Sequence, residues 1–192
     1  LQCSVSGELP SSCEGHSIEA IHLESIRPLT LFANKQIIGL VSGQGGNYSY
    51  CLAELLGRAG HKVVAVQADF HSLFSKEDQP GLLQFLEAKQ VHCPIRKGQW
   101  YDRVATGGNH SFGTEILLSG KFRELLKDLR SRYDKILVFV RAPIRATETQ
   151  AVCSWSEQMI VTVAEEPVDQ LAPLITWAAA SPSEARLTFM MT

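Results

Sequence analysis

Hydrophobic residues gather in short, nearly continuous runs that are separated by loops and by segments with helical spacing. A run of this kind is typical of a strand that is covered on both faces of a parallel sheet. We predict central strands in the strongest runs and, in the weaker ones, a further strand and an edge strand. In chain order the six are Gln36–Val41, Lys62–Val66, Tyr101–Ala105, Lys135–Val140, Met159–Ala164 and the edge strand Arg186–Met190.

Between these runs, apolar side chains recur with the period of an amphipathic helix. Leu52, Leu55, Leu56 and Ala59 follow this period, and Gly60 is a helix stop. Pro80 lies close to the first turn of a short helix. The other predicted helices are a segment from Ser17 that ends before Pro28, Ser119–Arg132, Thr147–Trp155 and Val168–Ala179.

The alternation of strand and helix predicts an α/β fold with a doubly wound, mainly parallel sheet flanked by helices, in three layers. Ligands of such folds bind beyond the carboxyl ends of the strands. Residues 1–16 show little periodicity, and we expect a loosely ordered arm there. Residues 17–192 are expected to form a single domain.

Composition narrows the choice of function. A net charge of -2 and a pI near 6.3 give no electrostatic footprint for nucleic acid or for an acidic membrane surface. No apolar run is long enough to cross a bilayer. The 5 cysteines contain no C-x-x-C pair, which favours a reduced, cytosolic setting, and the 6 histidines lack metal-ligand spacing, so we assign no metal.

The stretch Ile37–Ala59 joins a strand to a helix through a glycine-rich loop of Gly43, Gln44, Gly45, Gly46, Asn47 and Tyr48. Glycines let backbone N–H groups point inward, and the following helix adds its positive dipole, so such a loop is suited to hold an anion. A working nucleotide loop also needs Lys and then Ser or Thr, where Gly46 and Asn47 stand. A plain turn and a degenerate nucleotide loop both account for this stretch.

Further motifs, taken in order, resemble one family. They are the A-G-H-K-V segment from Ala59, the strand VVAVQADF, Pro80-Gly81-Leu82, and the run from Arg103 to Phe139 with its E-I-L-L-S-G-K-F helix. Over roughly Ser17 to Trp177 the chain resembles the cytoplasmic domain of bacterial tyrosine kinases (BY-kinases), which pair with or are fused to polysaccharide co-polymerases. These kinases lie within the wider MinD/ParA class of deviant-Walker ATPases. The resemblance implies a P-loop NTPase-like fold.

The chain departs from that family at the nucleotide site. The Walker A Lys and hydroxyl are missing, the first of two aspartates after the second strand is Gln67, and only Asp69 remains. Phe139 stands where the resemblance places the Walker B aspartate. Loss of this set removes the groups that orient Mg²⁺, so we expect no catalytic residue, no metal and no cofactor. The family's oligomerisation motif and its tyrosine-rich tail are also eroded.

The resemblance therefore implies a non-catalytic pseudokinase that acts as a docking or regulatory part of exopolysaccharide or capsule assembly. Its expected partner is a membrane polysaccharide co-polymerase or another export protein, and its expected location is the inner face of the plasma membrane. The chain itself could also form a homo-oligomer. An alternative is a divergent ATPase or autokinase that uses ATP and Mg²⁺ through Gln67, Asp69 and Arg141. A third is a metal-free anion sensor. We expect Tyr48 and Tyr50 to fill the vacated pocket.

Overall fold

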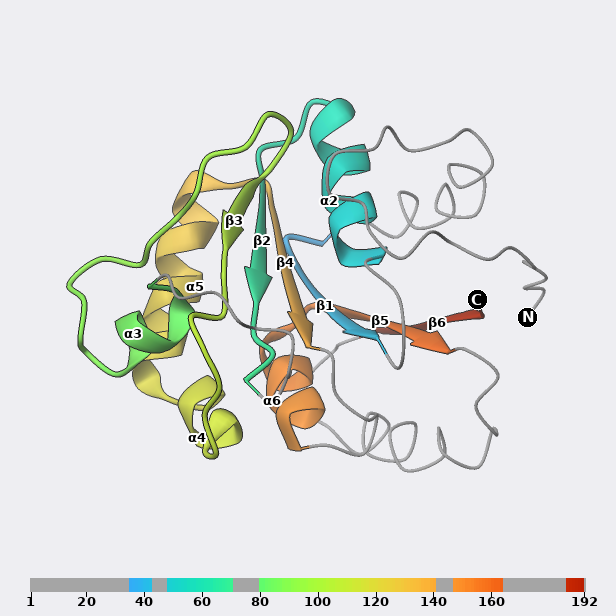
Figure 1. Cartoon of the computed structure of the whole chain (residues 1–192). Coiled ribbons are helices and arrows are strands. Elements are labelled where there is room, and N and C mark those ends of the chain that lie inside the picture. Colours follow the sequence, from blue (N-terminus) through green and yellow to red (C-terminus); the bar gives the residue numbers. More distant parts are fainter. Residues whose placement is uncertain (1–34, 43–47, 71–79, 141–146, 164–185, 192) are drawn as a thin grey trace.

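The computed structural model describes residues 35–42, 48–70, 80–140, 147–163 and 186–191. Within them lies a 6-stranded sheet with the order β3-β2-β4-β1-β5-β6, in which every pair of neighbouring strands is parallel (Figure 1). The strands are β1 (Ile37–Ser42), β2 (Val63–Gln67), β3 (Asp102–Val104), β4 (Lys135–Val140), β5 (Gln158–Val163) and β6 (Arg186–Met191).

Helices lie on both faces of this sheet and divide the core in two. On one face, α2 packs with Leu40, Leu137 and their neighbours. On the other, α3, α4, α5 and α6 contribute to a second cluster with Val138 and Val161. The helices are α2 (Tyr48–Arg58), α3 (Leu82–Leu86), α4 (Gly113–Leu117), α5 (Gly120–Arg132) and α6 (Thr147–Trp155).

Strand β4 shows why the apolar runs form central strands. All 6 of its residues are buried. Because side chains alternate along a strand, Ile136 and Val138 enter the α5 face, whereas Leu137 and Phe139 enter the α2 face. In β1, Gly39 makes room for Met159 of β5 and Val152 of α6, since a Cβ there would lie 2.1 Å from the Met159 sulfur and 3.1 Å from the Val152 Cγ1. The hydrophobic run of β4 thus packs against helices on both faces of the sheet.

The predicted α/β fold with a doubly wound parallel sheet is confirmed, including β6 as an edge strand. The helical periods did not predict α4, although the family resemblance implies a helix that begins at Glu115, inside α4. Pro80 directly precedes Gly81, the N-cap of α3, and so lies close to the first turn as predicted. Ser119 is the N-cap of α5 and accepts a hydrogen bond from the Phe122 amide (3.2 Å). The predicted helices that begin at Ser17 and at Val168, and the arm over residues 1–16, lie outside the described residues.

The free edge of β3 is bridged by the loop that precedes it. Arg96 and Arg103 exchange two backbone hydrogen bonds of 2.8 Å in an isolated antiparallel bridge.

Cys93 and Cys153 are free thiols, and burial raises the pKa of each to about 12. Cys51 is disulfide-bonded, which differs from the reduced cysteine expected there. None of the helices in the described ranges could cross a bilayer.

Candidate functional site

Predicted site residues meet at the carboxyl ends of two neighbouring strands. Gln67, the last residue of β2, is the register partner of Phe139 in β4, and the Phe139 carbonyl accepts a 2.9 Å hydrogen bond from the Ala68 amide. Asp69 follows shortly after and is buried. Gly43 to Asn47 lie outside the described residues, and Tyr48 is described only as the first residue of α2. The vestigial nucleotide loop stays a prediction.

Tyr50 of α2 joins the two strand ends. Its hydroxyl donates a 3.3 Å hydrogen bond to the side-chain oxygen of Gln67. Its ring meets Phe139 edge-on, with 5.0 Å between centroids and an interplanar angle of 81°. This is a favourable arrangement for two aromatic rings. Tyr50 therefore lies against both positions at which an aspartate of the family pattern is missing.

Two residues of the β3 segment also contact Tyr50 and Gln67. The Arg103 guanidinium donates to the same Gln67 oxygen at 3.2 Å and lies 4.9 Å from the centroid of the Tyr50 ring. Tyr101 stacks on Tyr50 at 6.0 Å. We call Tyr50, Gln67, Tyr101, Arg103 and Phe139 the tyrosine cluster. Sequence reasoning missed Tyr101 and Arg103, although their alternation with Asp102 in a short strand places both on one face.

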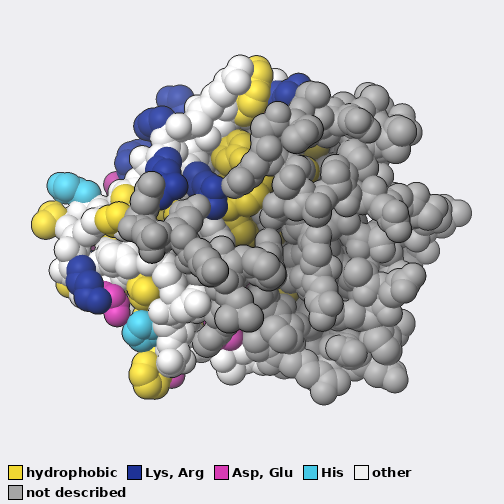
Figure 2. Space-filling model, viewed as in Figure 1, with side chains coloured by type: hydrophobic (Ala, Val, Ile, Leu, Met, Phe, Trp, Pro, Cys, Tyr) yellow, Lys and Arg dark blue, Asp and Glu magenta, His cyan; other side chains and the backbone are white. Residues whose placement is uncertain are grey.

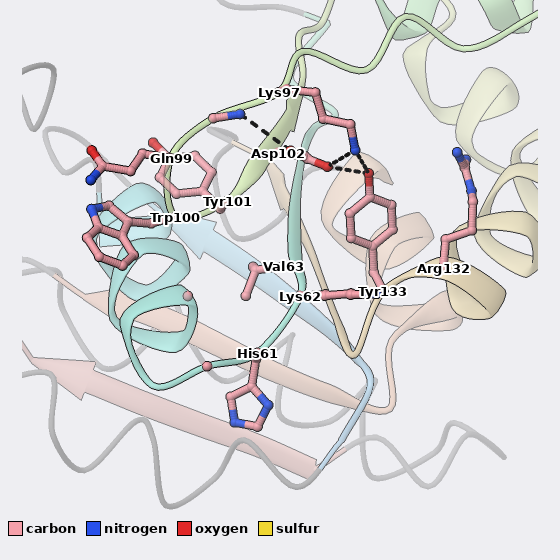
Figure 3. Close-up of a pocket in the computed structure, with 13 residues that line it drawn as sticks. His61, Lys62, Val63, Lys97, Gln99, Trp100, Tyr101, Asp102, Arg132 and Tyr133 are labelled. Carbon is pink, nitrogen blue, oxygen red and sulfur yellow. Dashed lines mark hydrogen bonds and ion pairs between the residues drawn. The ribbon is translucent and has the colours of Figure 1, made fainter.

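A second group of polar and aromatic side chains lies at the opposite, amino-terminal ends of the strands. There a cavity of about 490 Å³ opens between the end of α2, the start of β2 and β3, and the end of α5. We call it the amino-terminal pocket. Figure 3 shows Lys97 and Tyr133 converging on Asp102, with Trp100 on the far side over α2. Figure 2 shows Lys and Arg side chains gathered on the side of the molecule where β3 and its preceding loop lie.

Asp102 is the centre of a charged network in this pocket. The Lys97 ammonium donates to one carboxylate oxygen at 2.6 Å, and the Tyr133 hydroxyl donates to the same oxygen at 2.6 Å. The Gly98 amide donates to the other oxygen at 3.4 Å, and Lys97 also lies 3.5 Å from the Tyr133 hydroxyl. The carboxylate is thus held from three sides.

The pKa values follow this geometry. Burial opposes ionisation of Asp102, but the hydrogen bonds from Lys97, Tyr133 and Gly98 outweigh it and lower the pKa of the carboxyl. The hydrogen bond to Asp102 raises the pKa of Lys97. Burial, and then the hydrogen bond to Asp102, raise the pKa of Tyr133. At neutral pH the network is an ion pair with a protonated phenol, so it anchors structure and is poorly suited to remove a proton.

The comparisons place the chain among known proteins. No family model matches it. Over 165 residues, 77% of the chain, it is 30% identical to a Ralstonia solanacearum protein named "Putative tyrosine-protein kinase EpsB". The chain spans only 21% of the length of that relative.

Solved structures agree with this relationship. The fold matches the kinase domain of VpsO with a TM-score of 0.73 at 19% identity, covering 88% of this chain and 90% of that one. This chain is a BY-kinase-like domain. A further match, the BceF tyrosine kinase domain, has a TM-score of 0.71 at 20% identity, covering 88% of this chain and 77% of that one. The predicted P-loop NTPase-like fold of this BY-kinase-like domain is confirmed.

Proposed function

We propose that this BY-kinase-like domain has no phosphoryl-transfer activity and acts as a docking or regulatory part of a bacterial exopolysaccharide or capsule assembly system. The observation that carries the proposal is the tyrosine cluster. The positions that correspond by resemblance to Mg²⁺-orienting aspartates are Gln67 and Phe139, and Tyr50 is packed against both. On this proposal, the chain keeps the fold of the family, but the side chains at its nucleotide site have changed.

The chemistry of these side chains does not fit Mg²⁺. This ion takes oxygen ligands in near-ideal octahedral geometry and is usually bound through one or two carboxylates. Phe139 offers no oxygen, and the Gln67 oxygen already accepts hydrogen bonds from Tyr50 and Arg103. In phosphoryl transfer a single charged contributor can supply ~10³-fold or more in rate, so loss of several removes the reaction.

The cellular role in this proposal rests on the family resemblance. BY-kinases pair with or are fused to membrane polysaccharide co-polymerases, so the proposed partner is such a co-polymerase or another export protein. The domain would then act at the inner face of the plasma membrane. The 30% identity to a protein named as a tyrosine kinase supports the kinase ancestry that this role requires.

Calorimetric titration with Mg-ATP and Mg-ADP tests the catalytic half of the proposal. We expect no magnesium-dependent heat from this chain, while the VpsO kinase domain serves as the positive control under the same conditions. A Gln67→Asp variant, which returns one carboxylate to the end of β2, tells whether that position alone limits metal binding. Micromolar, magnesium-dependent binding to the unaltered chain would overturn the proposal.

Asp69 favours a second candidate, a divergent ATPase or autokinase. It is the aspartate that the resemblance retains after the second strand, and it is 4% exposed at the end of β2. A buried carboxylate just beyond the carboxyl end of a central strand is a functional group that such an enzyme would keep. Transfer of label from radioactive ATP to phosphate or to the chain, abolished in Asp69→Asn, would establish this activity. Absence of turnover would leave the docking role.

A further inference from the structure

Cys51 lies in the first turn of α2 and is joined to a second cysteine by a disulfide. The chain has 5 cysteines, and two of them, Cys93 and Cys153, are free thiols. The second sulfur of the bond therefore belongs to Cys3 or Cys13. Either pairing joins the amino-terminal part of the chain covalently to the helix that follows the glycine-rich stretch.

A disulfide is unusual in the setting proposed for this domain. At the inner face of the plasma membrane, glutathione and thioredoxin keep most thiols reduced, and the disulfides that do form there are usually transient and serve catalysis or redox sensing. The sequence contains no C-x-x-C pair, which is the motif of thiol–disulfide oxidoreductases. Redox sensing is therefore the role that the Cys51 disulfide fits. In this respect the inference rests on the location given by the proposed function.

The two free thiols differ from Cys51 in reactivity. Burial raises the pKa of Cys93 and of Cys153 to about 12, so almost none of either is present at neutral pH as the thiolate, which is the reactive form. Cys51 lies instead in the first turn of an 11-residue helix, where the helix dipole stabilises a negative charge. A thiolate that leaves from this position during thiol–disulfide exchange is thereby favoured.

The bond is attached next to the altered nucleotide site. Tyr50, the residue before Cys51, contacts Gln67 through a 3.3 Å hydrogen bond and meets the Phe139 ring edge-on. Leu52, the residue after it, is fully buried and belongs to the same hydrophobic cluster on the α2 face of the sheet. The disulfide therefore acts on the turn of α2 that carries the central ring of the tyrosine cluster.

We propose that the Cys51 disulfide is a redox switch that ties the amino-terminal part of the chain to the start of α2 under oxidising conditions and releases it under reducing conditions. On oxidation, the two thiols give two electrons and two protons to glutathione disulfide, and two molecules of glutathione leave. On reduction, a glutathione thiolate attacks the partner sulfur and Cys51 leaves as the thiolate. A second glutathione then resolves the mixed disulfide and forms glutathione disulfide. Docking beside α2 is thus coupled to the redox state.

A redox titration of the full chain tests the switch. It uses no nucleotide and no magnesium, so its failure is distinct from failure of the pseudokinase proposal. The chain is equilibrated in mixtures of reduced glutathione and glutathione disulfide and quenched in acid. Its thiols are alkylated after unfolding and counted by mass spectrometry. We expect two more alkylated cysteines in reduced glutathione alone than in excess glutathione disulfide, and the change should reverse. A disulfide that survives reduced glutathione, or that never forms, would overturn the proposal.

Single substitutions locate the bond and its effect on α2. Cys51→Ser should abolish the change in alkylation, and only one of Cys3→Ser and Cys13→Ser should do the same. Cys93→Ser is the matched control and should keep the change. The NMR signals of Tyr50 should differ between the two forms of the unaltered chain and should not respond to glutathione in Cys51→Ser. Circular dichroism verifies that each variant is folded. Identical Tyr50 signals in both forms of the unaltered chain would overturn the coupling to α2.

Discussion

The tyrosine cluster and the amino-terminal pocket both contain residues of the same short β3 segment. Tyr101 and Arg103 of the β3 segment project to the α2 face and join the tyrosine cluster, while Asp102 between them projects to the α5 face and joins Lys97 and Tyr133. The period of two along a strand makes this division unavoidable. Rings fill the space around Tyr50 at the carboxyl ends, whereas the cavity at the amino-terminal ends, which Tyr101 also lines, has charged groups around it.

This contrast indicates which interactions stabilise each of the two regions. At the carboxyl ends, aromatic side chains contact one another and the hydrogen bonds involve the neutral oxygen of Gln67. At the amino ends, an ion pair determines the arrangement. Truncation of a side chain should therefore lower stability most in the tyrosine cluster. A change of pH or salt should instead affect the Lys97–Asp102–Tyr133 network.

Phe139→Ala is expected to have the largest effect on stability. It removes a ring that is 8% exposed and leaves Tyr50 without its edge-on partner. We expect a loss of about 3 kcal/mol in the free energy of unfolding, measured by urea titration with circular dichroism. Leu118→Ala, at a side chain that is 52% exposed, is the control and should change it by less than about 0.5 kcal/mol. Equal losses in the two variants would contradict the packing argument.

Asp102→Asn should cost about 2 kcal/mol at neutral pH, because two hydrogen bonds lose their charged acceptor. The folded state lowers the pKa of this carboxyl below 3.8, so its contribution is present above that value and is lost as pH falls through the lowered pKa. The difference between the unaltered chain and the variant should therefore shrink between about pH 6 and about pH 2. A difference independent of pH would place the effect in packing.

Gly57→Ala tests the close approach that forms one wall of the pocket. The new Cβ would meet the backbone of Trp100, so the loop must shift, at a cost of about 1.5 kcal/mol. Gly60→Ala is the contrasting variant, since Gly60 has φ +94° and no neighbour within 4 Å. It should lose stability through backbone strain alone. Tryptophan emission should change in Gly57→Ala and stay constant in Gly60→Ala.

Tyr50→Phe should have the smallest effect, about 0.5 kcal/mol. It deletes a hydrogen bond of 3.3 Å to Gln67 but keeps the ring contacts with Phe139 and Tyr101. Arg103 still donates to the Gln67 oxygen in this variant. Thermal unfolding beside the Phe139→Ala protein measures the contrast. A loss as large as that of Phe139→Ala would mean that the hydrogen bond, and not the ring, holds the cluster.

Much of the fold was predictable because apolar runs such as β4 are buried on both faces, a pattern that survives in sequence. The family resemblance, and not the apolar pattern, placed Gln67 and Phe139 at one site. The helical periods missed α4, since its 5 residues are too few to show a period. The amino-terminal pocket was not predicted, because Lys97, Asp102 and Tyr133 are brought together only by tertiary packing and no motif joins them.

The bridge between Arg96 and Arg103 has a consequence for self-association. An exposed edge strand offers unpaired N–H and C=O groups on which a second chain can add a strand. The loop before β3 occupies these groups at Arg103 with two hydrogen bonds of its own. Growth of the sheet from molecule to molecule is thereby blocked at β3.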